Sequence, residues 1–251
     1  AAYTLGAEVE NLTYTGAGNF TGSGQALNNS LTGGTGNDSL SGLAGNDTLI
    51  GLGGNDTLDG GLGIDSLVGG SGDDVYRLDV LTDLVSESAD EGSDRVELAL
   101  TAAGSYTLTA NVEQALVTSA GDSFAVNVTG NALANSLTGH AGANLLAGLD
   151  GDDTLDGAAG NDTLDGGLGN DSLVGGLGND LYLVGSALDV VSEASGEGTD
   201  RVDTTLASYT LSDNVEILAY TGAAAFAGTG NAGHNSLVGA AGNDTLDGLA
   251  G

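Results

Sequence analysis

Residues 33–77 read GGTGNDSLSGLAGNDTLIGLGGNDTLDGGLGIDSLVGGSGDDVYR, which is one nine-residue unit written five times. Glycine opens each unit and returns three positions later, as at Gly33 and Gly36. An aspartate takes the sixth place and a large apolar residue the eighth, as at Asp38 and Leu40. Such a strict period predicts a stacked repeat architecture.

Each unit can supply one short strand and one turn. Three residues such as 57–59 form a very short strand, with the central side chain on one face. Six residues that begin with glycine can reverse the chain, because glycine adopts backbone angles closed to other residues. Two units then make one flattened coil, and neighbouring coils bury each other's leucines. We therefore expect an all-β solenoid with parallel strands.

The units fall into blocks within a longer period of about one hundred residues. The tripeptide YTL recurs at Tyr3, Tyr106 and Tyr209, and strict units return from Gly148 and again at Gly239. Both ends fall inside a module, so we expect further copies in the natural protein. The expected organisation is the end of a spacer at 1–23, block 1 at 24–77 (strict from 33), a β-rich spacer at 78–129, block 2 at 130–183 (strict from 148), a second spacer at 184–229, and the truncated start of block 3 at 230–251. A helical turn is expected only around 81–89.

The charge is strongly acidic. Thirty-five acidic residues face three arginines, which gives a formal net charge of −32. Low hydrophobicity with such charge is typical of disorder, yet 40% of the residues are apolar and recur periodically. Both facts agree if cations bind the folded state. Nucleic acid and anionic membranes need basic patches, so neither is an expected partner. No apolar run reaches the ~20 residues that span a bilayer, so we expect no membrane insertion.

Aspartates eighteen residues apart are expected to stack on neighbouring coils. Carboxylates at a spacing of ~4.8 Å repel each other unless a cation lies between them. Carboxylate and carbonyl oxygens suit calcium better than zinc or copper, and the absence of cysteine excludes a thiolate site. The predicted metal ligands are Asp38, Asp47, Asp56, Asp65, Asp74, Asp153, Asp162, Asp171, Asp180 and Asp244.

The pattern GGxGxDxUx, with U large and apolar, resembles the calcium-binding nonapeptide of the RTX (repeats-in-toxin) family. The resemblance implies a parallel β-roll, calcium held between turns n and n+2, and passage through a type I secretion channel to the exterior or cell surface of a bacterium. It implies about three ions in the first block and about two in the second. The spacers are similar to those of large tandem RTX surface proteins. Asparagine replaces aspartate at Asn29, Asn135, Asn144 and Asn235, where we expect weak calcium binding or none.

Other residues are interpreted structurally. Tyr76 and Tyr182 stand at the apolar position and are expected to be core caps that close the roll. His140 and His234 are expected to be surface or turn residues, while Arg95 and Arg201 are expected in ion pairs. No catalytic motif is present, so we expect no enzyme in this segment.

The sequence thus predicts a calcium-binding structural module of a large secreted tandem-repeat protein, such as a stalk, filament, surface-layer element or adhesin scaffold. It would fold on binding extracellular calcium, and its partners would be calcium ions and further copies of itself. Three alternatives stay open. The segment could be the export and folding module of a toxin or hydrolase whose catalytic domain lies elsewhere. It could be an adhesin that binds a surface through a threonine face (Thr48, Thr57, Thr154 and Thr163). It could also be a self-assembling fibre subunit.

Overall fold

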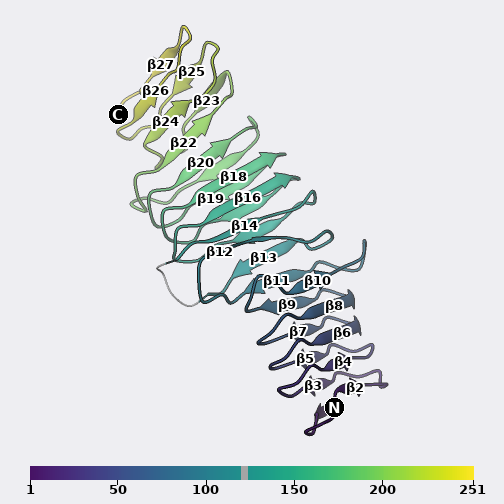
Figure 1. Ribbon diagram of the computed structural model, residues 1–251. Coiled ribbons are helices and arrows are strands. Elements are labelled where there is room, and N and C mark those ends of the chain that lie inside the picture. Colours follow the sequence, from purple (N-terminus) through teal and green to yellow (C-terminus); the bar gives the residue numbers. More distant parts are fainter. Residues whose placement is uncertain (120–123) are drawn as a thin grey trace. The chain divides into compact units, whose positions relative to one another are not determined.

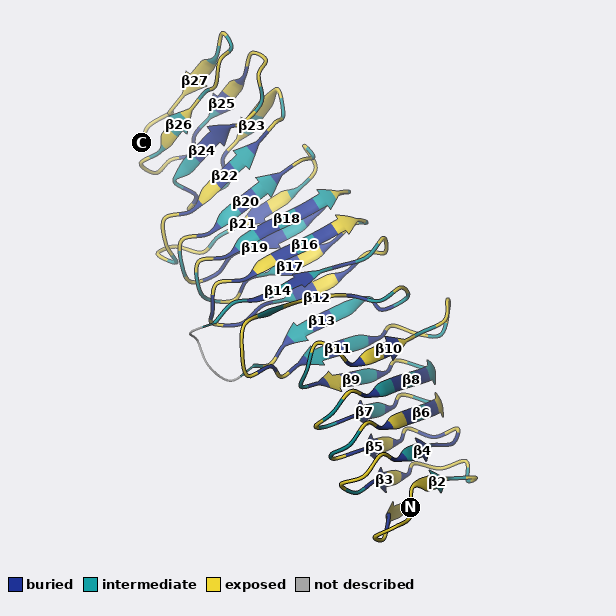
Figure 2. Ribbon diagram, viewed as in Figure 1, coloured by how far each residue is buried: buried dark blue, intermediate teal, exposed yellow. Residues whose placement is uncertain are grey.

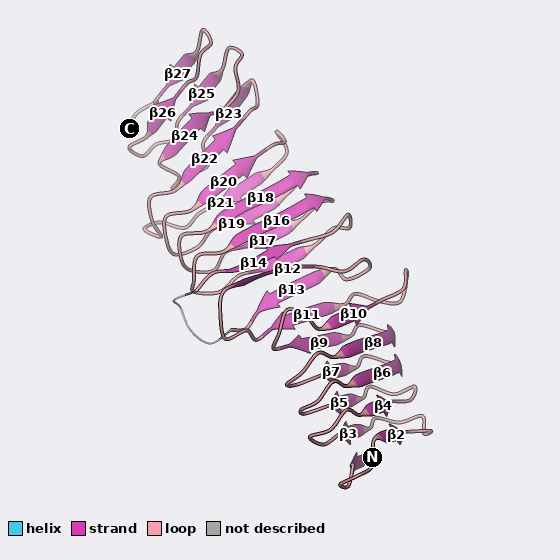
Figure 3. Ribbon diagram, viewed as in Figure 1, coloured by secondary structure: helices cyan, strands magenta, loops and turns pink. Residues whose placement is uncertain are grey.

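The computed structural model describes residues 1–119 and 124–251, and this part of the chain contains strands and no helix (Figure 3). The all-β expectation is confirmed. No described helix is therefore available to cross a membrane. The helical turn expected around 81–89 is wrong, because β10 (Leu84–Ser86) lies there. Val85 pairs with Leu67 of the neighbouring strand and is buried, so core packing favours the extended form.

The chain divides into two compact units, which we describe separately. Unit 1 comprises Ala1–Gly104 and Leu108–Ala120. One of its sheets contains, in spatial order, β1 (Ala2–Thr4), β3 (Thr21–Ser23), β5 (Ser39–Ser41), β7 (Thr57–Asp59), β9 (Val75–Leu78), β11 (Arg95–Leu98) and β13 (Gln114–Val117). The other contains β10, β8 (Ser66–Ser71), β6 (Thr48–Gly53), β4 (Ser30–Thr32) and β2 (Asn11–Thr13). All the pairings recorded in both sheets are parallel, and Figure 1 shows the strands stacked as successive coils.

Unit 2 comprises Ser105–Thr107 and Gly121–Gly251 and repeats the arrangement. Its long sheet contains β12 (Gly104–Thr107), β14 (Val126–Thr129), β16 (Leu145–Asp150), β18 (Thr163–Leu168), β20 (Leu181–Val184), β22 (Arg201–Thr204), β24 (Ile217–Tyr220) and β26 (Ser236–Val238). Opposite strands are β15 (Ser136–Thr138), β17 (Thr154–Asp156), β19 (Ser172–Val174) and β21 (Val190–Ser192). A further sheet contains β23 (Ser208–Thr210), β25 (Ala227–Thr229) and β27 (Thr245–Asp247).

The core is the column of apolar residues at the eighth place of each unit. Leu40 pairs with Leu58, which pairs with Tyr76, and all three are at most 1% exposed. The side chains stack in register because strands eighteen residues apart are direct neighbours. Figure 2 shows the resulting alternation of buried and more exposed residues along the strands. The predicted inward-facing leucines are confirmed.

The second glycine of a unit is required where neighbouring coils touch. Gly63 has φ +148°, and a Cβ built there would lie 1.8 Å from the carbonyl oxygen of Gly45 in the preceding coil. A side chain at this position would therefore both strain the backbone and separate the coils.

The regions expected to be spacers continue the same sheets. β11 pairs with β9, and β22 pairs with β20, so each sheet continues beyond the strand that contains Tyr76 or Tyr182. Both tyrosines are fully buried as expected, but the idea that they close the roll is wrong. The long period is visible in the backbone as well. Glu8, Asn111 and Asn214 follow at intervals of 103 residues and share φ values of 62–65°.

Candidate metal centres

The sixth residue of each unit forms a ladder of hydrogen bonds along the coil edge. We call the ten predicted aspartates the aspartate rungs, and Asn29, Asn135, Asn144 and Asn235 the asparagine rungs. Oδ1 of Asp56 accepts the backbone N–H of Asp38 at 2.7 Å, and Oδ1 of Asp74 accepts that of Asp56 at 2.6 Å. The eighteen-residue strand register brings each carboxylate to the coil before it. The predicted stacking of Asp38, Asp56 and Asp74 is thus confirmed.

The other edge and unit 2 follow the same rule. Oδ1 of Asp65 accepts the N–H of Asp47 at 2.7 Å. In unit 2 the carboxylates of Asp171 and Asp180 accept from Asp153 and Asp162 at 2.9 and 2.7 Å. Oδ1 of each of these carboxylates therefore accepts a backbone N–H group from the preceding coil.

The second oxygen of most aspartate rungs is buried and has no hydrogen-bond partner. This holds for eight of the ten predicted residues, namely Asp47, Asp56, Asp65, Asp74, Asp153, Asp162, Asp171 and Asp180. Each of these side chains is at most 2% exposed. A buried oxygen that bears charge and lacks a partner costs several kcal/mol, about 1–3 even for a neutral group. A cation at these oxygens would remove that cost.

Two predicted ligands differ from the rest. Oδ2 of Asp38 accepts the backbone N–H of Gly34 at 2.6 Å, so both of its oxygens are used. Asp244 is only half-buried, and its Oδ1 accepts the N–H of Phe226 at 3.0 Å. The carboxylates of these two residues therefore have less need of a bound cation than the other eight.

The opening glycine of each unit makes room beside the carboxylate. A Cβ built on Gly51 would lie 2.1 Å from Oδ2 of Asp56 and 2.7 Å from the carbonyl oxygen of Gly69. Gly33, Gly42, Gly148 and Gly157 show the same pairing of a carboxylate and a carbonyl oxygen. The space left by the missing side chain is thus bordered by hard oxygen donors, which is the donor set that calcium prefers.

Burial raises the pKa of the eight rung carboxyls that have an unpartnered oxygen. It is the main cause of the rise for Asp56, to about 6, and for Asp74 and Asp162, to about 7. The backbone N–H that each Oδ1 accepts lowers the pKa, and the carboxylate on an adjoining coil raises it. Without a cation, folding therefore opposes the ionisation of these carboxyls.

The arginines do not neutralise the rungs. Arg95 pairs with Glu97 at 2.8 Å, and Arg77 pairs with the same glutamate at 3.1 Å. Arg201 pairs with Asp203 at 2.5 Å. The expectation of structural ion pairs for Arg95 and Arg201 is confirmed. The chain has no lysine, and each arginine forms an ion pair with an acidic residue that is not an aspartate rung.

Sequence reasoning missed carboxylates of the spacers that continue the ladder. Oδ1 of Asp83 accepts the N–H of Asp65 at 3.0 Å, and Oδ1 of Asp94 accepts that of Asp74 at 2.8 Å. Both residues have an unpartnered, buried Oδ2. Asp83 follows Asp65 by the usual eighteen residues, a signal that the sequence contains. Asp94 follows Asp74 by twenty, which hides it from a search for strict units.

Two glutamates of the spacers join the ladder. Ligand oxygens of Asp74, Glu87 and Asp94 lie within 4.8 Å of one another, and so do those of Asp180, Glu193 and Asp200. Neither glutamate was among the predicted ligands, because each lies in a spacer, outside the nonapeptide pattern that selected the aspartates.

The asparagine rungs differ from the aspartate rungs in their side-chain hydrogen bonds, because an amide also has a donor. Nδ2 of Asn144 donates to the carbonyl oxygen of Val126 at 2.6 Å, and Nδ2 of Asn235 donates to that of Val215 at 3.1 Å. Nδ2 of Asn135 donates to Oδ1 of Asn131 at 3.3 Å. Asn29 is the exception, since its Nδ2 is buried without a partner. Three of the four amides thus donate Nδ2 to protein groups, whereas eight of the ten carboxylates keep an unpartnered Oδ2.

Neither histidine adds to these centres. His234 is exposed as expected, whereas His140 is buried at 7% exposure, which differs from a surface position. Its ring packs on Phe124 with the centroids 5.6 Å apart, and its Nδ1 lies 3.2 Å from Oδ1 of Asn144. His140 therefore supports an asparagine rung and no aspartate rung.

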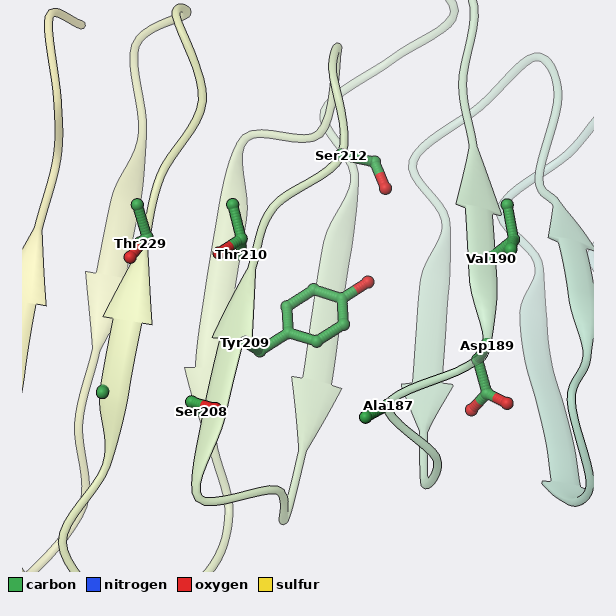
Figure 4. A pocket seen from close by; sticks show the side chains of 9 residues that line it. Ala187, Asp189, Val190, Ser208, Tyr209, Thr210, Ser212 and Thr229 are labelled. Carbon is green, nitrogen blue, oxygen red and sulfur yellow. The ribbon is translucent and has the colours of Figure 1, made fainter.

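A pocket in unit 2 is not a second metal centre. Asp189, Val190 and Tyr209 are among the residues that line it (Figure 4). Both oxygens of Asp189 accept backbone N–H groups, from Asp171 at 3.2 Å and from Ser186 at 2.9 Å. No lining carboxylate is left with an unpartnered oxygen here.

The repeat pattern matches a known family. The family described as RTX calcium-binding nonapeptide repeat (4 copies) matches at residues 23–58, 50–83, 129–164, 148–182 and 229–251. Together these ranges cover more than half of the chain. A search of curated proteins found no match.

Proposed function

Because the chain belongs to the family of RTX calcium-binding nonapeptide repeats, we propose that it is a structural module that folds when calcium binds to its aspartate rungs. The observation that carries the proposal is the row of eight buried carboxylate oxygens that have no partner within the protein. Calcium, the cofactor that the family and the acidic clusters imply, supplies the missing positive charge.

The residues that would hold calcium are the aspartate rungs and the carbonyl oxygens of the opening glycines. Oδ1 of these rungs stays fixed by the backbone, and in the eight rungs with an unpartnered Oδ2 that second oxygen is free to contact an ion. Without calcium, a chain with a net charge of −32 repels itself, and burial of the rungs opposes their ionisation. Binding free energy would then become folding free energy.

We place the module outside a bacterial cell, exported by type I secretion, because extracellular calcium is far more abundant than cytosolic calcium and the family is typical of secreted proteins. Its role would be that of a stalk, filament or scaffold, with further copies of itself as neighbours. The acidic surface makes nucleic acid and anionic membranes unsuitable partners.

The adhesin alternative receives no support from the threonines. Thr48 pairs with Ser30 and Ser66, and Thr57 pairs with Ser39 and Val75 on a different sheet. Thr154 pairs with two serines as well, and Thr163 pairs with two leucines. No continuous threonine row arises from these pairings. The role of an export module for an enzyme encoded elsewhere on the parent chain stays open, and it shares the calcium chemistry.

The test is a calcium titration in chelated buffer, followed by circular dichroism, with magnesium as the control. We expect a cooperative gain of β signal with calcium and little response to magnesium, which gives up its water reluctantly. A chain that is fully folded in chelator at pH 7.5 and indifferent to calcium would contradict the proposal.

A further inference from the structure

Two carboxylate clusters outside the nonapeptide pattern share one construction. Asp74, Glu87 and Asp94 form the first, and Asp180, Glu193 and Asp200 form the second, 106 residues later along the chain. In both, the first aspartate is the last rung of its block and the other two residues come from the following spacer. The clusters lie in different units, so the same arrangement arises in two separate environments.

A tyrosine holds each glutamate in place. The backbone N–H of Gly69 donates to Oη of Tyr76 at 2.7 Å, and the hydroxyl of Tyr76 donates to Oε1 of Glu87. In unit 2, Gly175 donates to Tyr182 at 2.6 Å, and Tyr182 donates to Oε1 of Glu193. Tyrosine stands where other units have leucine, and its hydroxyl reaches the coil edge. One carboxylate oxygen of each glutamate is thereby fixed.

The remaining oxygens converge without partners. In the first cluster, Oδ2 of Asp74, Oε2 of Glu87 and Oδ2 of Asp94 are all buried and unpartnered. In the second, this is true of Oδ2 of Asp180 and Oε2 of Glu193. Asp74, Asp94 and Asp180 are at most 2% exposed. The arginines that follow Asp94 and Asp200 form their ion pairs with other acidic residues, Arg95 with Glu97 and Arg201 with Asp203.

The longer coil explains why a glutamate is needed. Asp94 follows Asp74 after twenty residues, and Asp200 follows Asp180 after twenty, two more than within a block. These coils lack the nonapeptide turn, so the glycine carbonyls that serve the block rungs are not supplied by the same motif. A carboxylate from the longer turn, aimed by the tyrosine, provides the oxygen instead.

We propose that Glu87 and Glu193 each complete a divalent-cation site, together with Asp74 and Asp94 or Asp180 and Asp200, which binds calcium outside the nonapeptide repeats. The site fastens the spacer strand β11 to β9 in unit 1, and the spacer strand β22 to β20 in unit 2. The proposal rests on the proposed function, since it uses the same ion, but it assigns residues that the repeat motif does not contain.

The test is a count of bound calcium by equilibrium dialysis on the full chain, with Glu87→Gln/Glu193→Gln compared with wild type. Glutamine keeps an acceptor for each tyrosine hydroxyl and removes only the charge. We expect the variant to bind two ions fewer, one for each cluster. The matched control is Glu91→Gln/Glu197→Gln, which removes two charges from the same turns but leaves the clusters intact, and it should keep the wild-type count.

Terbium luminescence keeps the test informative if the variant folds poorly. Terbium replaces calcium, and the chain has no tryptophan, so excitation reports tyrosines close to bound ions. We expect Tyr76→Phe/Tyr182→Phe to lose most of the sensitised emission. An unchanged ion count and affinity in Glu87→Gln/Glu193→Gln, or unchanged emission in the tyrosine variant, would overturn the inference. If wild type bound no calcium at all, the proposed function itself would have failed.

Discussion

The aspartate and asparagine rungs occupy the same place in the coil, and they differ in how their second polar atom is satisfied. Asn144 donates its Nδ2 to a carbonyl oxygen of the preceding coil, whereas Oδ2 of Asp162, eighteen residues later, is buried with no partner. Oδ1 of Asn144 accepts the backbone N–H of His140 in its own turn, and Oδ1 of Asp162 accepts the backbone N–H of Asn144 from the preceding coil. At these two rungs the amide is satisfied by protein groups, whereas the carboxylate keeps one buried oxygen that a cation could partner.

Turning an aspartate rung into an asparagine rung should have the largest effect. Asp56→Asn removes the charge while Oδ1 can still accept from Asp38. At free calcium 100-fold above Kd, each lost ion lowers the free energy of unfolding by about 2.7 kcal/mol. In chelator the variant should instead retain more β signal than wild type. Thermal melts with calcium and with chelator measure both effects.

Asp73→Asn is the matched control for that variant. Asp73 is the exposed residue beside a rung, at a place where most units already carry asparagine. Asp73→Asn should leave the calcium dependence of the melting temperature unchanged. Equal responses of Asp56→Asn and Asp73→Asn would show that net charge alone, and no special property of the rung, determines calcium binding.

Acid should partly replace calcium. The pKa of Asp74 and Asp162 is about 7 in the fold and near 3.8 in the unfolded chain, so the fold binds more protons. Metal-free stability is therefore greatest below pH 4 and is lost as pH rises through about 7. In chelator, the β signal at pH 5 should exceed that at pH 8. With calcium the trend should reverse, because protons compete for the same oxygens. A metal-free β signal that grows with pH would contradict the account.

Filling the space beside a rung should have a smaller effect. In Gly51→Ala the new Cβ would lie 2.1 Å from Oδ2 of Asp56, and the strain should cost about 1–3 kcal/mol and raise the calcium concentration at half-folding. Gly53→Ala is the control, since its nearest neighbour is the Ser71 hydroxyl at 3.2 Å. Calcium titrations of the two variants should differ, and equal midpoints would argue against an ion at this place.

Replacing an asparagine rung with aspartate should have the smallest effect. Asn144→Asp loses the hydrogen bond to Val126 and gains a charge, which should lower metal-free stability by about 1 kcal/mol. Calcium should restore the loss, because the new carboxylate faces the coil of Asp162. Thermal melts at increasing calcium follow this recovery, and a deficit that calcium does not reduce would count against the comparison.

The sequence alone predicted the repeating part of the molecule well. The nine-residue period determined the register and the inward leucines, because both follow from local geometry and from stacking of identical coils. It did not determine every strand length, since strands such as β6 and β8 contain six residues where three were expected. Asp83 could have been found as well, since it keeps the eighteen-residue spacing from Asp65.

The spacers were harder to predict. A two-residue insertion before Asp94 breaks the period, so the continued stacking of β9 and β11 is visible only in the structure. The contact of Tyr76 with Glu87 joins residues whose separation matches neither the nine-residue unit nor the eighteen-residue coil, and a polar run gives no sign that its glutamate is partly buried. The buried position of His140 depends on Phe124 in the preceding coil.

The most direct test of the central claim is a crystal structure of the calcium-loaded chain with anomalous diffraction data collected to locate the ions. We expect anomalous peaks beside Oδ2 of the buried aspartate rungs and none beside Asn135 or Asn144. Peaks at the asparagine rungs, or aspartate edges without any ion in a folded chain, would contradict the claim.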